Sequence, residues 1–436
     1  MTESPTIIRN PDDPWARMMR QPLWRRLSGL VLVSLFCEIA MAVVVTFALP
    51  LYLNEHLRWR EDDVGPVTSA FLLAETITKP FFAWISDRFG RKILIVFGIA
   101  LSSFAVYRMS TATGHWEFIT LSALNGIGGA ALWPNVFAAV ADVTSERERV
   151  GSMSVFNMMY MIGLGLGPVV GSVVYRLAAA GRANTAPAWL WIPSRESDIF
   201  RVTTGILLIA LVSALFLIPW LHHKHATAGS APGLRNIPVR WPVLGFFMAM
   251  SFFQTLGIQL LNNPLVFYLR QVLKLDAGDI GLPFILLGAA VAVLAIPVGT
   301  WGGKWGRVRS VKLGIGVAAL GMILLPLRPS LGYFMIIAVP MILGFLLCIP
   351  AWLAMITELA PPAYRGRIYG WVVTMQGLGA AFGPWLGTKV LVKVGHHAPF
   401  MLSGIVLGTT LLAALFFLRE GMRAVDDPAV AGVPVS

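Results

Sequence analysis

Charged residues are scarce in this sequence. Lys, Arg, Asp and Glu make up 13% of its 436 residues and hydrophobic residues 56%, whereas soluble domains carry about 25% charge. Cysteine is almost absent: Cys37 and Cys348 both lie in apolar stretches, where they are expected to be small buried hydrophobic residues and give no information about disulfides. The sequence has no phosphate-binding Gly-rich loop, no His-Glu-x-x-His pair and no distinct serine nucleophile turn. We therefore expect no enzyme, no cofactor and no use of ATP.

Long apolar stretches dominate what remains. A helix needs about 20 apolar residues to cross a hydrocarbon core about 30 Å thick. Hydrocarbon offers no partner to unpaired backbone groups, so such stretches must be helical. The sequence predicts an all-α membrane protein with twelve transmembrane helices at 27–53, 64–85, 93–112, 116–141, 151–175, 201–221, 241–269, 279–302, 310–328, 332–357, 366–391 and 398–418.

The second half of the chain repeats the first at an offset of 216 residues. Glycine, proline and arginine recur at this offset, as in Gly65 and Gly281, Gly90 and Gly306, or Pro168 and Pro384. Duplicated units of this kind build a central site between two halves. We expect two pseudo-symmetric six-helix bundles at 27–221 and 241–420, with an N-terminal segment at 1–26, a linker at 222–240 and a tail at 421–436.

The net charge of +12 sits in short loops between the apolar stretches. Lys and Arg are more frequent on the side of the N-terminus, which predicts that both termini are cytoplasmic and that no nucleic acid is bound. The linker histidines His222, His223 and His225 could bind a metal. A solvated loop is the simpler interpretation, so we expect no metal site.

The loop after the second stretch reads Asp87-Arg88-Phe-Gly90-Arg91-Lys92, preceded by Ala83. It resembles the signature loop of the major facilitator superfamily, in which the first position is glycine. The resemblance implies a conformational latch in which Asp87 approaches the eleventh helix near Arg365 when the cytoplasmic side is closed. Gly303 stands where Asp87 stands in the first half, so the acidic latch belongs to one half. The expected latch residues are Asp87, Arg88, Arg91, Asp142, Arg307, Glu358 and Arg365. Arg91 should meet Asp142 at the end of the fourth stretch and, by the repeat, Arg307 should meet Glu358.

A glycine–proline pattern marks the fifth stretch and recurs in the eleventh. It resembles a motif of the drug–proton antiporter branch of the superfamily, although a generic seam of small residues remains the alternative. An arginine that this branch carries in the fourth helix is replaced by Ser122. The expected packing residues are Gly163, Gly167, Pro168, Gly171, Gly379, Gly383, Pro384 and Gly387.

Three charges fall near the middle of apolar stretches: Glu38, Glu75 and Lys79. A charge at this depth is costly and should face the bundle interior. Glu75 and Lys79 are one turn apart and could form a structural pair. Glu38 has no partner within its own helix, so we expect it to face the central cavity and to take up a proton. The three residues are the predicted proton-coupling site.

Neutral polar residues in the same stretches predict a cavity for an amphipathic substrate. These are Asn125, Asn135, Asn157, Tyr160, Gln254, Asn262 and Gln376. We expect a monomeric inner-membrane transporter that contacts the lipid bilayer and a small-molecule substrate, coupled to protons or another ion. Proton-coupled efflux is favoured. The alternatives are a symporter or facilitator for a small metabolite such as a sugar or organic acid, and a sensor or scaffold that transports nothing.

Overall fold

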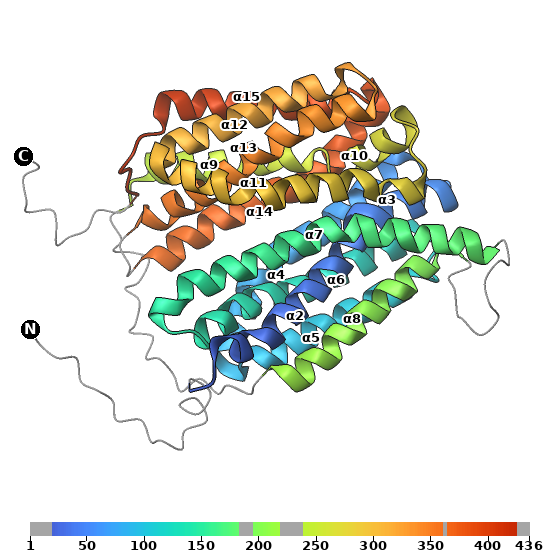
Figure 1. Ribbon diagram of the computed structural model, residues 1–436, viewed down its shortest axis with the longest axis horizontal. Coiled ribbons are helices and arrows are strands. Elements are labelled where there is room, and N and C mark those ends of the chain that lie inside the picture. Colours follow the sequence, from blue (N-terminus) through green and yellow to red (C-terminus); the bar gives the residue numbers. More distant parts are fainter. Residues whose placement is uncertain (1–19, 183–194, 219–238, 361–363, 425–436) are drawn as a thin grey trace, which may run out of the picture.

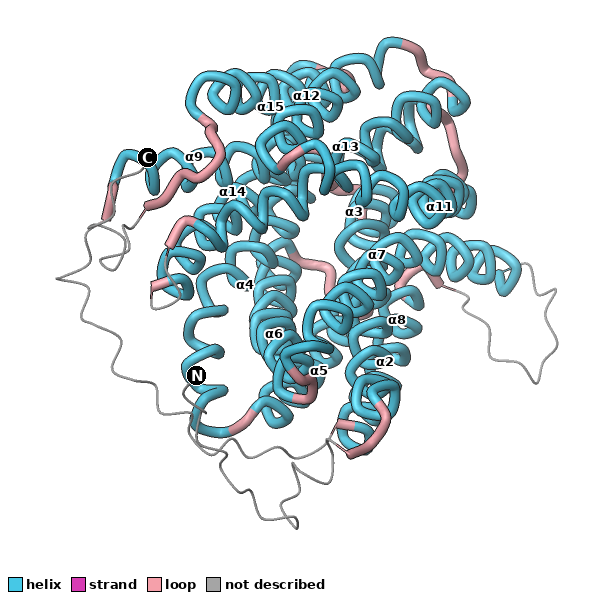
Figure 2. Tube along the Cα trace, turned by 60° about the vertical axis from the view of Figure 1, so that its left-hand side comes forward, coloured by secondary structure: helices cyan, strands magenta, loops and turns pink. Residues whose placement is uncertain are grey.

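The computed structural model describes residues 20–182, 195–218, 239–360 and 364–424, which are almost entirely helical (Figures 1 and 2). The N-half contains α2 (Leu23–Ala42), η1 (Val43–Ala48), α3 (Leu49–Leu51), η2 (Tyr52–His56), α4 (Glu61–Phe89), α5 (Arg91–Met109), α6 (His115–Asp142), α7 (Glu146–Arg182) and α8 (Asp198–Leu217). The C-half contains α9 (Trp241–Gln259), α10 (Pro264–Phe267), η4 (Tyr268–Val272), η5 (Ala277–Asp279), α11 (Gly281–Trp305), α12 (Arg307–Leu324), η6 (Leu325–Leu327), α13 (Leu331–Glu358), α14 (Arg365–Val394) and α15 (Ala398–Phe417).

Nine helical segments of the described chain are long and apolar enough to cross a membrane. The helices α4, α11 and α14 add segments of 29, 25 and 30 residues, one at each remaining predicted position. The expected all-α membrane fold is therefore confirmed, and the described residues supply a long helix for every predicted crossing.

The repeat is visible in the backbone as well as in the sequence. Unusual conformations recur 216 residues apart, each at the same place in its half. The pairs are the π-helical segments Tyr52–His56 and Tyr268–Val272, Arg58 and Lys274 with φ of 58° and 55°, and Gly90 and Gly306 with φ of 87°. Gly90 and Gly306 each form the short turn between two helices. This turn needs a φ of 87°, which glycine adopts without strain, so glycine stands at both positions.

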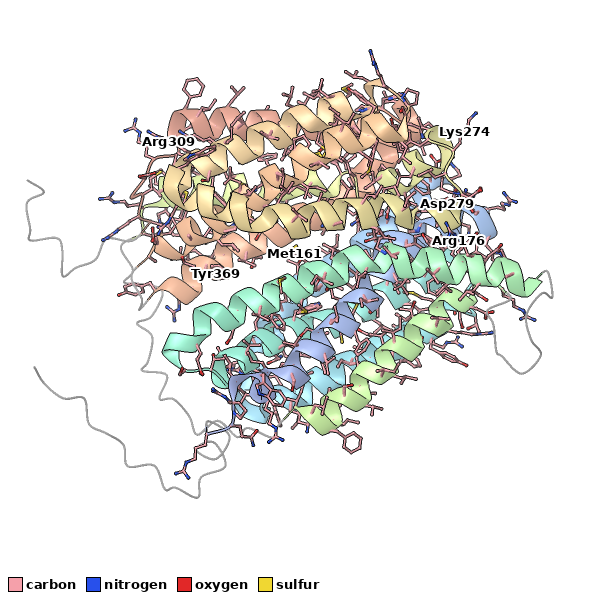
Figure 3. All side chains as sticks on the ribbon, viewed as in Figure 1. Met161, Arg176, Lys274, Asp279, Arg309 and Tyr369 are labelled. Atoms are coloured by element: carbon pink, nitrogen blue, oxygen red, sulfur yellow. The ribbon has the colours of Figure 1, made fainter. Side chains whose placement is uncertain are left out.

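The two halves lie side by side, with α4 and α14 in contact across their boundary and α7 beside α11 (Figure 1). We name the two ends of the bundle by residues. The Gly90 end holds the turns at Gly90 and Gly306, and the Glu55 end holds residues 57–60 and 273–280. Figure 3 places Arg309 at the first end and Lys274 at the second.

Glycines allow the halves to touch near the Glu55 end. A Cβ on Gly65 of α4 would lie 2.6 Å from the carbonyl oxygen of Pro384 in α14. Its counterpart Gly281 in α11 meets α7 at Val169, where an added Cβ would lie 2.9 Å from the Cα. The same close crossing therefore occurs twice, once with each half supplying the glycine.

The predicted segment boundaries stay predictions for the two termini and the linker, because residues 1–19, 219–238 and 425–436 lie outside the described chain. The last described residues return to the C-half. Ala424 donates its N–H to the carbonyl of Leu359 at 2.7 Å and accepts the N–H of Arg240 at 2.7 Å. This segment therefore bridges the end of α13 and the start of α9.

Candidate functional site

Glu38 is enclosed inside the N-half. It lies in the last two turns of α2 and its residue is 4% exposed. The hydroxyl of Tyr160 on α7 forms a hydrogen bond with its carboxylate. Gly163, one turn after Tyr160, makes room for this acid: a Cβ there would lie 2.7 Å from the Cβ of Glu38. Glu38 is thus enclosed between α2 and α7, and its partner comes from another helix; that it faces a central cavity stays a prediction.

Glu75 and Lys79 form the expected ion pair one turn apart on α4, with 2.8 Å between Nζ and Oε1. The side chain of Glu75 is 14% exposed and that of Lys79 37%. Glu75 is also close enough to Glu38 for their charges to interact. When both acids are ionised, the cluster of Glu38, Glu75 and Lys79 holds one excess negative charge inside the N-half. A charge held there must be neutralised, by a proton or by a cation.

The glycine face of α7 packs against the first helix of its own half. Gly167 lies against Ala42 and Val43, and a Cβ on Gly171 would lie 2.5 Å from the Phe47 ring. This contact covers the point where α2 changes into the π-helical segment η1. Such segments are uncommon and are often found at functional sites. The glycines of the motif therefore pack against the helix that carries Glu38, at the point where its winding changes from α-helical to π-helical.

The same packing recurs in the C-half without the acid. Gly379, Gly383 and Gly387 of α14 lie against Phe252, Gln259 and Leu260 at the end of α9. At the 216-residue offset, Gln254 replaces Glu38 and Gln376 replaces Tyr160. The packing is thus common to both halves, and the buried acid belongs to one.

The predicted cavity residues have mixed environments. Asn125, Asn135 and Gln254 are 1%, 1% and 5% exposed, so they are enclosed by protein. Asn135 donates to the carbonyl of Ala131, Gln254 to the Cys348 sulfur at 3.5 Å, and Asn262 to Gln259 at 3.0 Å. Gln376 is half-buried, and the side chain of Asn157 lies outside the described residues. Tyr160 belongs to the Glu38 cluster, and its ring packs edge-on against Trp133 at 5.3 Å.

A second cluster, which the sequence did not reveal, joins the two halves. We call it the Glu55 cluster: Glu55 and Tyr175 of the N-half and Arg270 of the C-half. Glu55 accepts Arg270 Nε at 2.5 Å and the Tyr175 hydroxyl at 3.2 Å. Arg270 lies 215 residues from Glu55 along the chain, so no local sequence pattern links the two.

Other contacts between the halves gather at the same end. Arg176 pairs with Asp279, and Figure 3 shows these two side chains meeting between α7 and η5. Further hydrogen bonds join Thr68 to Asn263, Gln271 to Glu61, Trp385 to Ser69 and Gly281 to Ser172. This end of the bundle is therefore held shut by charged and polar groups from both halves.

Comparison with known proteins agrees with this geometry. A family model described as Major Facilitator Superfamily matches residues 31–261 and 247–434. The chain belongs to the major facilitator superfamily. Multidrug resistance protein 2 of Bacillus subtilis is 25% identical over 354 residues, covering 79% of this chain and 83% of that protein. The gentisate transporter of Corynebacterium glutamicum is 24% identical over 367 residues, covering 82% and 79%.

Solved superfamily structures share the fold. A bacterial homologue of the human lysosomal transporter Spinster, in an inward-facing and occupied conformation, has a TM-score of 0.73 at 14% identity and covers 92% of this chain and 98% of its own. The human organic anion transporter MFSD10 has a TM-score of 0.66 at 17% identity, covering 91% and 100%. These similarities show that the chain shares their fold.

The superfamily signature loop lies at the Gly90 end. Arg91 Nε is 3.3 Å from Asp142 Oδ2, and Arg91 also donates to Ser86 at 2.6 Å. The counterpart Arg307 pairs with Glu358, so both expected ion pairs are present. Each pair ties the start of a half's third helix to the end of its fourth.

The acidic part of the signature loop stays a prediction. Arg88 lies over the Trp84 ring, 4.7 Å from its centroid. The side chains of Asp87 and Arg365 lie outside the described residues, so the expected approach of Asp87 to α14 is untested.

Proposed function

We propose that this superfamily member exports small amphipathic cations in exchange for protons. The observation that supports this most directly is the pair of acids in the N-half, buried Glu38 and half-buried Glu75, with one lysine, Lys79, paired to Glu75. A duplicated fold needs no such charges to be stable, since the C-half has Gln254 and Val291 at the equivalent positions. The acids are retained at an energetic cost, which is typical of a functional site.

The exchange follows from competition for one carboxylate. Ionised Glu38 attracts a cation, and protonated Glu38 does not. The Tyr160 hydroxyl holds the carboxylate in place between the two states, donating to the ionised form. Lys79 occupies Glu75, so Glu38 carries the excess charge. Mutually exclusive binding of proton and substrate is the minimal requirement for antiport.

The Glu55 cluster supplies the second requirement, a barrier that opens on one side at a time. With both termini cytoplasmic in an inner membrane, the Glu55 end faces outward and is closed by Glu55, Tyr175 and Arg270. Opening that end requires these polar contacts to break and the halves to separate at the close crossings of Gly65 and Gly281. The latch at Asp87 would act at the opposite end.

A symporter or facilitator for an organic acid is the second candidate. The gentisate transporter among the relatives favours it, since that protein is named for an organic anion. In such a protein Lys79 would meet the substrate and the acids would bind the proton. A non-transporting sensor is disfavoured, because it has no need of charge at this depth.

Purified protein in liposomes with an imposed pH gradient tests the proposal. Lipophilic cations and aromatic acids are screened for movement in each direction. We expect cations to move against their own gradient while protons flow the opposite way. Uptake of acids together with protons would replace antiport by symport, and the absence of any movement would leave only the sensor.

A further inference from the structure

Several buried side chains of the N-half have polar atoms without a protein partner among the described residues, and two of these side chains lie on one face of α6. Ser122 and Asn125 of α6 are each 1% exposed. Among the described residues, no group bonds to the Ser122 hydroxyl, to the Asn125 amide nitrogen or to its oxygen. Buried amides and hydroxyls are normally hydrogen-bonded, because leaving them unpaired forfeits the bonds they make in water. An asparagine with both ends unpaired therefore needs a partner that is not protein.

The contacts of α6 place these groups next to the acid cluster. Gly126 lies against the backbone of Phe71, and a Cβ on Gly129 would lie 3.8 Å from the Glu75 carboxyl carbon. Helical periodicity puts residues 122, 125, 126 and 129 on one face of α6. Asn125 is thus one turn from the level of Glu75, and Ser122 is nearly one turn further towards the Glu55 end.

The C-half serves as an internal control for this feature. Its residues at the same offset are Ala338 for Ser122 and Met341 for Asn125. The same fold therefore packs with apolar side chains at these positions. At these two positions the fold therefore does not require polar groups, and in the N-half they lie on the same helix face as the residue that meets Glu75.

We propose that Ser122 and Asn125 form a water-binding site that delivers protons to Glu75 and Glu38 from the Glu55 end. Their hydroxyl and amide groups supply both donors and acceptors, which is the chemistry that a water molecule or hydronium ion requires. The titratable or charged groups facing this region are Glu75 and Lys79 on α4, Glu38 on α2 and Tyr160 on α7.

The proton step is simple to balance. A hydronium ion at the site gives its proton to a carboxylate oxygen of Glu75, forming one O–H bond there, breaking one on the ion and leaving a water molecule behind. The proton then passes to Glu38, whose charge interacts with that of Glu75. This route crosses the N-half interior and lets protons arrive while the Glu55 cluster keeps the substrate path closed. It rests on the proposed proton coupling.

The C-half suggests the variant that tests the site. Ser122→Ala with Asn125→Met converts both positions to their C-half residues. Ser122→Thr with Asn125→Ser keeps a hydroxyl at each and should preserve water binding. Ser103→Ala is the matched control, because this buried hydroxyl of α5 already bonds within its own helix, to Ile99 at 2.7 Å.

Each variant is measured in liposomes with the substrate found by the screen, once with a pH gradient and once by counterflow without one. We expect Ser122→Ala/Asn125→Met to lower gradient-driven transport by about tenfold or more, the effect of losing a positioned proton carrier. Counterflow should stay at the parent level, and the hydroxyl-keeping and control variants should behave like the parent.

Two results overturn the water site. Gradient-driven transport that survives the Ala/Met change shows that protons use another route. A parallel loss of gradient-driven transport and counterflow shows a packing or substrate role instead. If the parent protein itself shows no response to a pH gradient, the proposed proton coupling fails, which is a distinct outcome.

Discussion

At the scale of single residues, the N-half depends on glycine where α7 approaches Glu38. Gly163→Ala should lower stability by about 1–3 kcal/mol, because the new Cβ would overlap the Glu38 side chain. Gly165→Ala is the control in the same helix. Nothing lies within 4 Å of a Cβ there, so alanine should stabilise the helix by about 1 kcal/mol. Thermal unfolding in detergent measures both, and equal shifts for the two variants would contradict the packing.

A second residue-scale test concerns Glu148, which precedes the apolar part of α7. The N–H and hydroxyl of Ser145, with Arg26, lower the pKa of Glu148 from 4.5 to about 2. Because this pKa is depressed in the folded protein, its stabilisation is complete above pH 4.5 and is lost as the pH falls towards 2.

The Glu148→Gln variant should therefore unfold at a lower temperature than the parent at pH 6. The difference should shrink as the pH is lowered from 4.5. Thermal midpoints at a series of pH values measure this, and a difference that stays constant down to pH 3 would contradict a role for the ionised carboxylate. Asp62→Asn, which removes a half-buried carboxylate beside Arg60, is a suitable control.

At the scale of helices, the sequence predicted much of the fold. The length of the apolar stretches and the repeat of Gly90 at Gly306 were enough to place twelve helices in two bundles. The Arg91–Asp142 contact was also predictable, because the repeat supplies a second copy in Arg307 and Glu358.

The partners of the acids were not predictable. Pairing Glu38 with Tyr160, or Glu55 with Arg270, requires the rotation of each helix about its axis, which composition and spacing leave open. Glu75 and Lys79 were found in advance only because they share one helix. The change to π-helical winding at Val43 was also not predicted, because no distinctive residue pattern marks it.

The Glu55 cluster gives a prediction about helix movement. Glu55→Gln should weaken its bonds to Arg270 and Tyr175 and let the Glu55 end open. Spin labels at Thr113→Cys and Ser330→Cys, exposed at this end in opposite halves, report the separation once Cys37 and Cys348 are replaced by alanine. The open population should grow by about tenfold.

The control for this experiment is Asp62→Asn, since Asp62 pairs with Arg60 inside the N-half and spans no boundary. An unchanged distance distribution in Glu55→Gln, or an equal change in both variants, would mean that the cluster does not hold the halves together.

At the scale of the whole molecule, the two halves share one backbone and differ in charge. The turns, the π-helical segments and the glycine crossings occur in both. Glu38, Glu75 and Lys79 have the uncharged counterparts Gln254, Val291 and Ala295. In the proposed mechanism the common features serve the movement of the two halves, and proton handling lies in the N-half.

The most direct test of this account is Glu38→Gln, which gives the N-half the residue that the C-half has at Gln254. The variant is reconstituted in liposomes and measured with a pH gradient and by counterflow. We predict that accumulation of substrate against its gradient is abolished while the protein remains folded and Ser103→Ala retains full activity. If the Glu38→Gln protein concentrates substrate as well as the parent does, Glu38 is not the proton carrier and the central claim is wrong.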